Sequence, residues 1–401
     1  MSDDLIVRIA ARGDGVTTSG RHVAGAAPGD TITPNGSIVP GPHHAVPPCP
    51  HFGSCGGCQL QHVDDAALAD FVRDRVTGPL TAKGIVARDV RPVHLSPPRS
   101  RRRASLRYVR KGGQVVLGFA GQGSQDLVDI RACEIVTPRL HDVMMAVRGL
   151  IVKWPESRLS GSVELTEIDQ GVDVLISGLA PTTLAQHELL SGFAEAQKLA
   201  RLSIDQGFGP ETQYEPVPAT ISFGDIAVRF PQASFLQATR DGEAGLAAAA
   251  REALDGCRMV ADLFAGLGSF AFHLIAPGRR IYAAEAARDA ILALKAVADA
   301  RQLPVFTEHR DLFRNPVQRD MLDRLEGLVL DPPRAGAEEQ VRAIAGSSIR
   351  RVCYVSCNPA TFARDARILC DAGFALDTLW PVGQFRWSTH VELASLFLRQ
   401  P

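Results

Sequence analysis

The sequence predicts an α/β fold for its C-terminal part, with a parallel sheet wrapped by helices, preceded by a β-rich half. From about residue 240, Ala-rich helical runs such as Glu243–Leu254 and Ala286–Arg301 alternate with short β-rich runs. Those β-rich runs are Met259–Phe264, Arg280–Ala284, Gly327–Leu330 and Arg351–Val355. Such alternation is typical of a parallel sheet covered by helices. Between about 95 and 230 the pattern is mostly short strands, among them Gln114–Phe119, Val163–Ile168 and Val172–Ser177.

Length and composition limit the classes of protein to consider. A chain of 401 residues predicts two or three domains, each with its own core. It has no run of 18 apolar residues and its first residues are acidic, so we expect a soluble, cytoplasmic protein without a membrane partner. The formal net charge of −1 excludes wholesale attraction to nucleic acid, so any such contact must be local. No obligate protein partner is expected.

The first residues predict a small, OB-like β-barrel. The apolar run Leu5–Ile9 is followed by closely spaced glycines, which suit short strands with tight turns. Residues 64–84 carry apolar side chains at helical spacing. We therefore expect a barrel over residues 1–46, a β-rich domain over 47–230 and the α/β domain over 231–401. Within the second, residues 61–94 are expected to be helical and packed on the α/β domain.

Three cysteines, Cys49, Cys55 and Cys58, are spaced as C-x5-C-x2-C, with two glycines that let the backbone fold tightly. One further cysteine, Cys133, lies ahead of the α/β part. In a reducing compartment such cysteines indicate metal binding or catalysis. Four thiolates suit a cubane iron–sulfur cluster or a structural zinc ion, and both remain open. The spacing disfavours a radical enzyme in which S-adenosyl-L-methionine (AdoMet) binds the cluster.

A dense basic segment lies between residues 99 and 111, with no acidic residue within it. Its cations are Arg99, Arg101, Arg102, Arg103, Arg107, Arg110 and Lys111. In a nearly neutral protein this local density suits contacts with nucleic-acid phosphates. A merely solvated face is the alternative.

Val260–Phe270 is a strand, a G-x-G turn and the start of a helix. Glu285 ends the next strand, about 20 residues after the first glycine, where a carboxylate can bind ribose hydroxyls. Because the third glycine of the dinucleotide fingerprint is missing, a nucleoside such as AdoMet is favoured over a pyrophosphate.

Cys357 follows an apolar run, 349–355, within the turn-forming stretch Ser356–Pro359. Ligands of open α/β sheets bind at the carboxyl ends of strands, so a substrate can reach this thiol. The alternative is a small buried hydrophobic side chain, as free cysteine usually is.

Together, five segments resemble the RNA uracil-5-methyltransferase family across the whole C-terminal part. The segments are 235–237, 262–270, Asp331–Gly336, Ser356–Thr361 and Thr389–Glu392. The resemblance implies a Rossmann-like class I methyltransferase domain that uses S-adenosyl-L-methionine. The cysteines and the short barrel, which is similar to a TRAM domain, resemble the branch that acts on 23S rRNA and carries a 4Fe-4S cluster.

The resemblance also assigns residues. Contacts to AdoMet are expected from Gln237, Phe264, Gly266, Gly268, Ser269, Glu285, Asp311 and Asp331. The cluster ligands would be Cys49, Cys55, Cys58 and Cys133. The RNA contacts are expected from the charge density of the basic segment, at Arg99, Arg101, Arg102, Arg103 and Arg107. Cys357 would add to uracil C6, C5 would take the methyl group, and Glu392 would remove the C5 proton. The target base should be splayed or flipped out.

Two other interpretations stay open at this point. The same chemistry can act on tRNA or on another rRNA uridine, or the chain can be an RNA-binding module that has lost its activity.

Overall fold

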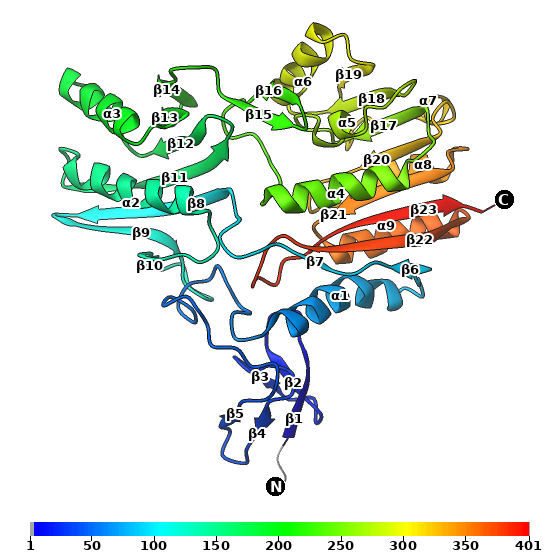
Figure 1. The fold of residues 1–401 in the computed structure, drawn as a ribbon, viewed down its shortest axis with the longest axis horizontal. Helices are drawn as coiled ribbons and strands as arrows, with labels where there is room; N and C mark the ends of the chain where they lie inside the picture. The colour runs from blue at the N-terminus through cyan, green and yellow to red at the C-terminus, as the bar shows by residue number, and fades with distance from the viewer. Residues whose placement is uncertain (1–3, 401) are drawn as a thin grey trace.

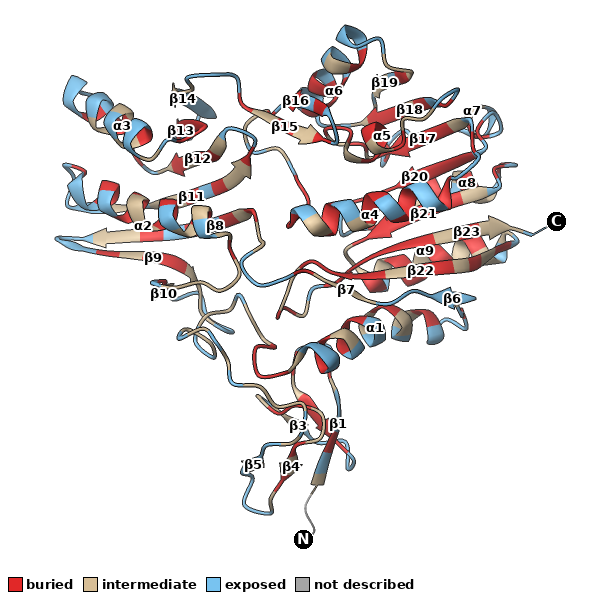
Figure 2. Cartoon of the chain, in the orientation of Figure 1, coloured by how far each residue is buried: buried red, intermediate tan, exposed pale blue. Residues whose placement is uncertain are grey.

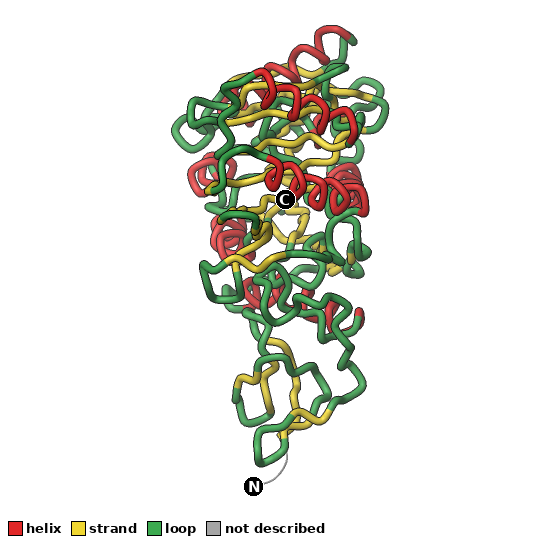
Figure 3. The backbone as a smooth tube through the Cα atoms, turned by 90° about the vertical axis from the view of Figure 1, so that its left-hand side faces the viewer, coloured by secondary structure: helices red, strands yellow, loops and turns green. Residues whose placement is uncertain are grey.

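The computed structural model describes residues 4–400. Two large sheets lie side by side, and a small N-terminal sheet projects below them (Figure 1). Turned by 90°, the molecule is elongated, with the N-terminal sheet at one end (Figure 3). Within residues 4–400, no helix has the length and apolarity needed to cross a membrane.

The C-terminal sheet has nine strands in the order β19-β18-β17-β20-β21-β23-β22-β6, with β7 also paired to β22. The parallel strands are β17 (Met259–Leu263), β18 (Arg280–Glu285), β19 (Val305–His309), β20 (Gly327–Leu330) and β21 (Arg351–Ser356). The last two strands of the chain, β22 (Phe374–Gly383) and β23 (Glu392–Arg399), are antiparallel to each other, and β23 is antiparallel to β21. The expected alternation of strands and helices is confirmed.

Helices cover both faces of this sheet. They are α4 (Arg240–Ala253), α5 (Ser269–His273), α6 (Arg288–Ala300), α7 (Arg319–Leu322), α8 (Glu338–Ala345) and α9 (Pro359–Asp371). Strand β21 shows why its sequence is continuously apolar: Val352 and Tyr354 enter the core under α8 and α9. The alternate residues Cys353 and Val355 enter the core under α4, α5 and α6. Because both faces are covered, the strand has no polar side: all of its residues after Arg351 are buried, and most of its length is coloured as buried in Figure 2.

Helix α1 (Asp65–Thr81) packs on the C-terminal sheet although it lies early in the chain, against α9 and β22. Asp64 begins it by accepting a hydrogen bond from the Ala67 N–H at 2.8 Å. Beyond it, β6 (Asp89–Val90) and β7 (His94–Leu95) pair in parallel with β22. The expectation of a helix over 61–94 is therefore wrong after residue 81, where the chain extends the sheet instead.

The central sheet has seven strands in the order β10-β9-β8-β11-β12-β13-β14. They are β8 (Arg103–Lys111), β9 (Gln114–Ala120), β10 (Leu127–Asp129), β11 (Arg158–Ile168), β12 (Gly171–Ser177), β13 (Arg201–Asp205) and β14 (Pro210–Tyr214). Two helices, α2 (Pro138–Lys153) and α3 (Leu184–Ala196), accompany it, so the expectation of mostly strands missed them. Their starts carry local signals: Thr137 before Pro138, and a capping box of Thr183 with Gln186.

A hairpin of β15 (Thr220–Phe223) and β16 (Ile226–Arg229) connects the two large sheets. Its buried residues Ile221, Phe223 and Val228 belong to the core under α4, α5 and α6. Because this hairpin shares the core of the C-terminal sheet, the C-terminal domain begins before residue 231, the boundary expected from the sequence.

The N-terminal sheet has the order β3-β2-β1-β4-β5. Its strands are β1 (Asp4–Ile9), β2 (Gly15–Thr17), β3 (His22–Val23), β4 (Thr31–Ile32) and β5 (Ile38–Val39). Three buried side chains, Ile6, Ala26 and Ile32, form its small core. Residues 1–3 of the expected barrel lie outside the described residues.

Candidate functional site

The pairing of β21 with β23 brings together two residues that are distant in sequence. Ser356 lies opposite Leu393 in this antiparallel pair. The next residue on one strand and the preceding residue on the other, Cys357 and Glu392, therefore end up as neighbours. Both line a cavity of about 770 Å³ at the carboxyl ends of the parallel strands. Cys357 is half-buried and Glu392 is buried.

The loop that carries Cys357 is tied to the loop after β20. The Asn358 side-chain N–H₂ donates to the Arg334 carbonyl at 2.8 Å, and the Thr361 hydroxyl donates to the same carbonyl at 3.2 Å. Asn358 also starts α9, because its side-chain oxygen accepts from the Ala360 N–H at 3.2 Å. Pro359 at the first helical position has no N–H that would need a partner. These bonds hold Cys357 against the Asp331–Gly336 segment.

The loop after β17 forms another wall of the cavity. The Glu285 carboxylate accepts from the Gly266 N–H at 2.9 Å and from the Ala287 N–H at 2.7 Å. Gly268 has φ +89°, and a Cβ there would lie 2.8 Å from the Phe272 ring and 2.9 Å from Leu294. Only glycine suits that position, because the loop packs directly on α5 and α6. The loop therefore leaves a cradle in front of a carboxylate, which fits the ribose of AdoMet.

Sequence reasoning missed Gln384, which links the other polar groups of the cavity. Its buried side-chain N–H₂ donates to the Gln237 side-chain oxygen at 2.8 Å and to the Glu392 carboxylate at 3.0 Å. Gln237 in turn donates to the Asp331 carboxylate at 3.3 Å. Asp331 and Glu392 thus belong to one hydrogen-bonded chain. A glutamine has no motif of its own, so only its position in the fold reveals this role.

Burial dominates the electrostatics of the cavity. It raises the pKa of Asp331 to about 7. It also raises the pKa of Glu392 well above its ordinary value, and the Asp331 charge adds to this while the Gln384 hydrogen bond opposes it. Burial and then the Glu392 and Asp331 charges raise the pKa of the Cys357 thiol to about 11, against the favourable charge of Arg334. A cation bound in the cavity would favour the ionised form of each group.

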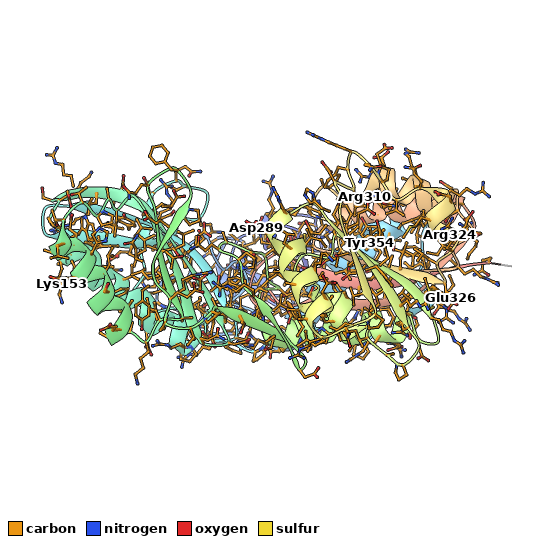
Figure 4. The ribbon with its side chains drawn as sticks, turned by 90° about the horizontal axis from the view of Figure 1, so that it is seen from above. Lys153, Asp289, Arg310, Arg324, Glu326 and Tyr354 are labelled. Carbon is orange, nitrogen blue, oxygen red and sulfur yellow. The ribbon has the colours of Figure 1, made fainter. Side chains whose placement is uncertain are left out.

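Most of the residues expected to contact AdoMet line this cavity. Those that do are Gln237, Phe264, Gly266, Ser269, Glu285 and Asp331. Asp289 also lines the cavity. In the view from above, it lies where the two halves of the molecule meet, whereas Tyr354 lies within the C-terminal half (Figure 4). Gly268 and Asp311 are not among the lining residues. The Asp311 carboxylate instead accepts from the Phe313 N–H at 3.0 Å, and the Phe313 ring packs 5.3 Å from Phe264, centroid to centroid.

The basic segment is not a continuous RNA-facing patch. Arg102 is 1% exposed, and it donates to the Glu243 carboxylate at 2.5 Å and to the Gln237 carbonyl at 3.0 Å. The expectation that Arg102 contacts RNA is therefore wrong, because a charge this deep in the protein needs an internal partner. Arg103 is half-buried, and its guanidinium donates to the Leu236 carbonyl at 2.6 Å.

Three other arginines of the segment keep more surface. Arg99 is exposed but paired with Glu134, and Arg107 is exposed on β8. Arg101 is half-buried, and its guanidinium lies 5.5 Å from the centre of the Phe385 ring. Contacts of these residues with RNA stay predictions.

The four expected cluster cysteines come from two segments and meet around one cavity. Cys49, Cys55, Cys58 and Cys133 all line a space of about 390 Å³ beside Arg101. Burial, with smaller contributions from charge on the other three cysteines, raises the pKa of Cys58 to about 12, as expected for thiols in proximity. In residues 4–400, however, no three His, Cys, Asp or Glu side chains are grouped closely enough for one metal ion.

Comparisons with known proteins agree with this geometry. The sequence model of the family described as tRNA (Uracil-5-)-methyltransferase matches residues 219–400. An uncharacterized RNA methyltransferase of Zymomonas mobilis is 45% identical over 394 residues, which cover 98% of this chain and 99% of that protein. The 23S rRNA (uracil(1939)-C(5))-methyltransferase RlmD of Nitrosospira multiformis is 31% identical over 411 residues, covering 94% of this chain and 92% of that protein.

Among solved structures, the tRNA (uracil-54, C5)-methyltransferase of Pyrococcus abyssi, in complex with S-adenosyl-L-homocysteine, superimposes with a TM-score of 0.75. It covers 99% of this chain and 100% of its own, at 19% identity, and so shows the shared class I methyltransferase fold. With relatives this similar over nearly its whole length, the chain belongs to the RNA uracil-5-methyltransferase family and is an AdoMet-dependent RNA methyltransferase.

Proposed function

We propose that this enzyme forms 5-methyluridine in 23S rRNA, with Cys357 as the nucleophile and Glu392 as the base. The observation that carries the proposal is the β21–β23 register, which sets this thiol beside this carboxylate in the same cavity as the Gly266–Glu285 cradle. A nucleophile and a base must both reach one bound base, so their adjacency matters more than the presence of either motif.

The chemistry needs both groups because uracil C5 is a poor nucleophile. Addition of Cys357, as the thiolate, to C6 forms the C6–sulfur bond, breaks the C5–C6 double bond and places its electron pair on C5, as an enolate. AdoMet would supply the electrophilic methyl group: its sulfonium S–CH3 bond breaks as the C5–CH3 bond forms, and S-adenosyl-L-homocysteine leaves. C5 then carries both the methyl group and its original proton. Glu392 takes that proton, the electron pair restores the C5–C6 double bond, and the C6–sulfur bond breaks to release Cys357.

The environment of Glu392 suits proton transfer. Burial raises the pKa of this carboxyl, which makes its carboxylate a stronger base than an exposed glutamate. The Gln384 side-chain N–H₂ donates to one oxygen of the Glu392 carboxylate and so orients it. Asp331, at the end of β20 and linked through Gln237, is placed to orient the uracil edge or the cofactor.

The choice of 23S rRNA is supported by the relative named as a 23S rRNA methyltransferase, which aligns over nearly the whole chain. The family description and the Pyrococcus abyssi structure name tRNA, so a tRNA uridine is the second candidate. Mapping 5-methyluridine in 23S rRNA and tRNA from a deletion strain separates them. Loss of a 5-methyluridine from tRNA alone would contradict the rRNA assignment.

A 4Fe-4S cluster held by Cys49, Cys55, Cys58 and Cys133 also belongs to the proposal. It is supported by the meeting of all four thiols around one cavity. Four cysteine thiolates are the usual ligand set of a 4Fe-4S cluster, and these four residues would hold it. The cluster would join the loop of residues 49–58 to the segment around Cys133. We propose no step of the methyl transfer through it.

The two catalytic roles are tested by substitutions that fail at different stages. Glu392→Gln keeps the nucleophile and nearly the same size but cannot accept the C5 proton. Its RNA should stay attached to Cys357 after methyl transfer, as a protein–RNA band on a denaturing gel that carries label from the AdoMet methyl group. Removal of a general base typically slows a reaction roughly 10²–10⁴-fold, so the band should persist.

Cys357→Ala is the matched control, because it should bind AdoMet and RNA but form no such band. Turnover by Glu392→Gln at the parental rate would show that another group is the base.

A further inference from the structure

The loop before Glu392, residues 384–391, is held by hydrogen bonds from the segment that follows the first three cysteines, residues 59–60. The backbone N–H groups of Gln59 and Leu60, directly after Cys58, both donate to the Trp387 carbonyl, at 2.8 and 2.9 Å. The Thr389 N–H donates to the Gln59 side-chain oxygen at 3.3 Å. The Gln59 side-chain N–H₂ donates back to the Gly56 carbonyl at 2.7 Å, between Cys55 and Cys58.

This loop needs external support. Trp387 has φ +59°, a left-handed backbone conformation that a bulky residue adopts only when its surroundings impose it. Arg386 is bound by the Ser96 carbonyl at 3.2 Å and by the Asp65 carboxylate. Residues 388–390 line the same cavity as the four cysteines. The loop is thus fastened from outside the C-terminal sheet, three to six residues ahead of Glu392.

The N-terminal sheet also contacts Gln59 and the loop before Glu392. A Cβ built on Gly13, in the turn after β1, would lie 3.1 Å from the Gln59 Cβ and 3.5 Å from the Thr389 Cγ2. Gln59 therefore lies where the N-terminal sheet, the cysteine segment and the loop before β23 meet.

We propose that Gln59 is a positioning residue for the base: by joining the cysteine segment to residues 387–389, it holds Glu392 where it can take the C5 proton. The inference rests on the proposed function of Glu392. Its consequence is specific, because loss of Gln59 should slow proton removal while the earlier addition and methyl transfer proceed. The cysteine segment then supports one chemical step through a hydrogen bond, without taking part in it.

The test uses full-length protein and RNA that carries tritium at uridine C5. In a single turnover, label transferred from the AdoMet methyl group reports methyl transfer, and tritium released to water reports removal of the C5 proton. For Gln59→Leu, methyl transfer should keep the parental rate, whereas tritium release should slow by roughly 2- to 12-fold, the scale of one lost hydrogen bond. A 5-deuterated substrate should then show a larger isotope effect than it does with the parent enzyme.

Gln59→Glu is the conservative control, since it keeps an oxygen that can accept from the Thr389 N–H, and should release tritium faster than Gln59→Leu. A general loss of folding would instead lower methyl transfer and tritium release together, and that result would overturn the inference. So would parental rates for both steps in Gln59→Leu.

Glu392→Gln in the same assay separates the role of Gln59 from the proposed role of Glu392 as the base. If Glu392→Gln delays tritium release and Gln59→Leu does not, only the role of Gln59 is refuted. If Glu392→Gln shows no delay, the assignment of the base fails and the role of Gln59 fails with it.

Discussion

Replacing Arg102 by Met should destabilise the protein strongly, although Arg102 lies in the segment that its sequence marks as a surface patch. The side chain is 1% exposed, and its partner Glu243 keeps only 10% of its side-chain surface. Arg102 also donates to the Gln237 carbonyl, so it joins the central sheet to the loop that enters the AdoMet cavity. Methionine fills a similar volume without charge or hydrogen bonds.

The magnitude follows from what the substitution leaves behind. Removing one partner of a buried ion pair leaves an uncompensated charge and typically costs about 3–5 kcal/mol. An exposed pair would cost only about 0–1 kcal/mol. The burial of both partners places Arg102–Glu243 in the first class. Removing both charges, in Arg102→Met with Glu243→Met, should recover most of the loss, because a buried pair replaced by apolar side chains of similar volume is often neutral.

Urea unfolding followed by circular dichroism measures this loss, and isothermal titration measures AdoMet binding, which should weaken in Arg102→Met because Gln237 loses its anchor. The exposed Arg107, five positions after Arg102 and within β8, offers a matched control: Arg107→Met should change the unfolding free energy little. A loss below about 1 kcal/mol for Arg102→Met would mean that the pair behaves as a solvated one. That result would refute the reasoning and restore Arg102 as a candidate for RNA contact.

Two further predictions concern the cysteines and the buried acids. Anaerobically purified protein should be brown with about four irons, and Cys55→Ser should lose iron and fold poorly; stoichiometric zinc without iron would contradict the cluster. The melting temperature of the ligand-free protein should fall as the pH rises towards 8, because burial, with smaller contributions from Asp331 and Glu285, raises the pKa of Asp262 from 3.8 to about 8. A group with a raised folded-state pKa contributes stability below its ordinary pKa and loses it as the pH rises through the raised value. Asp262→Asn should flatten this dependence, and an unchanged slope would show that Asp262 does not titrate there.

The elements that could be predicted from the sequence are those whose pattern follows from burial alone. Parallel strands covered on both faces are continuously apolar, and β17, β18, β20 and β21 lie where those runs predict them. The amphipathic helix α1 was predicted for the same reason, from one apolar stripe. Helices α2 and α3 were missed because their capping signals, at Thr137 and Thr183, are local and short beside the strand-like runs around them.

By itself, the sequence determined the chemistry that the protein carries: a thiol on a turn, a G-x-G loop after a strand and three closely spaced cysteines, each identifiable because its motif is contiguous or nearly so. Only the tertiary structure decided which of these groups meet. The antiparallel return of β23 beside β21 makes neighbours of Cys357 and Glu392, and Gln384 and Gln59 gain their roles from the loops they join. Arg102 shows the same limit, because the presence of an arginine in the sequence does not reveal whether it lies on a solvated surface or in a buried ion pair. Burial and pairing are properties of three-dimensional proximity, which spacing along the chain does not encode.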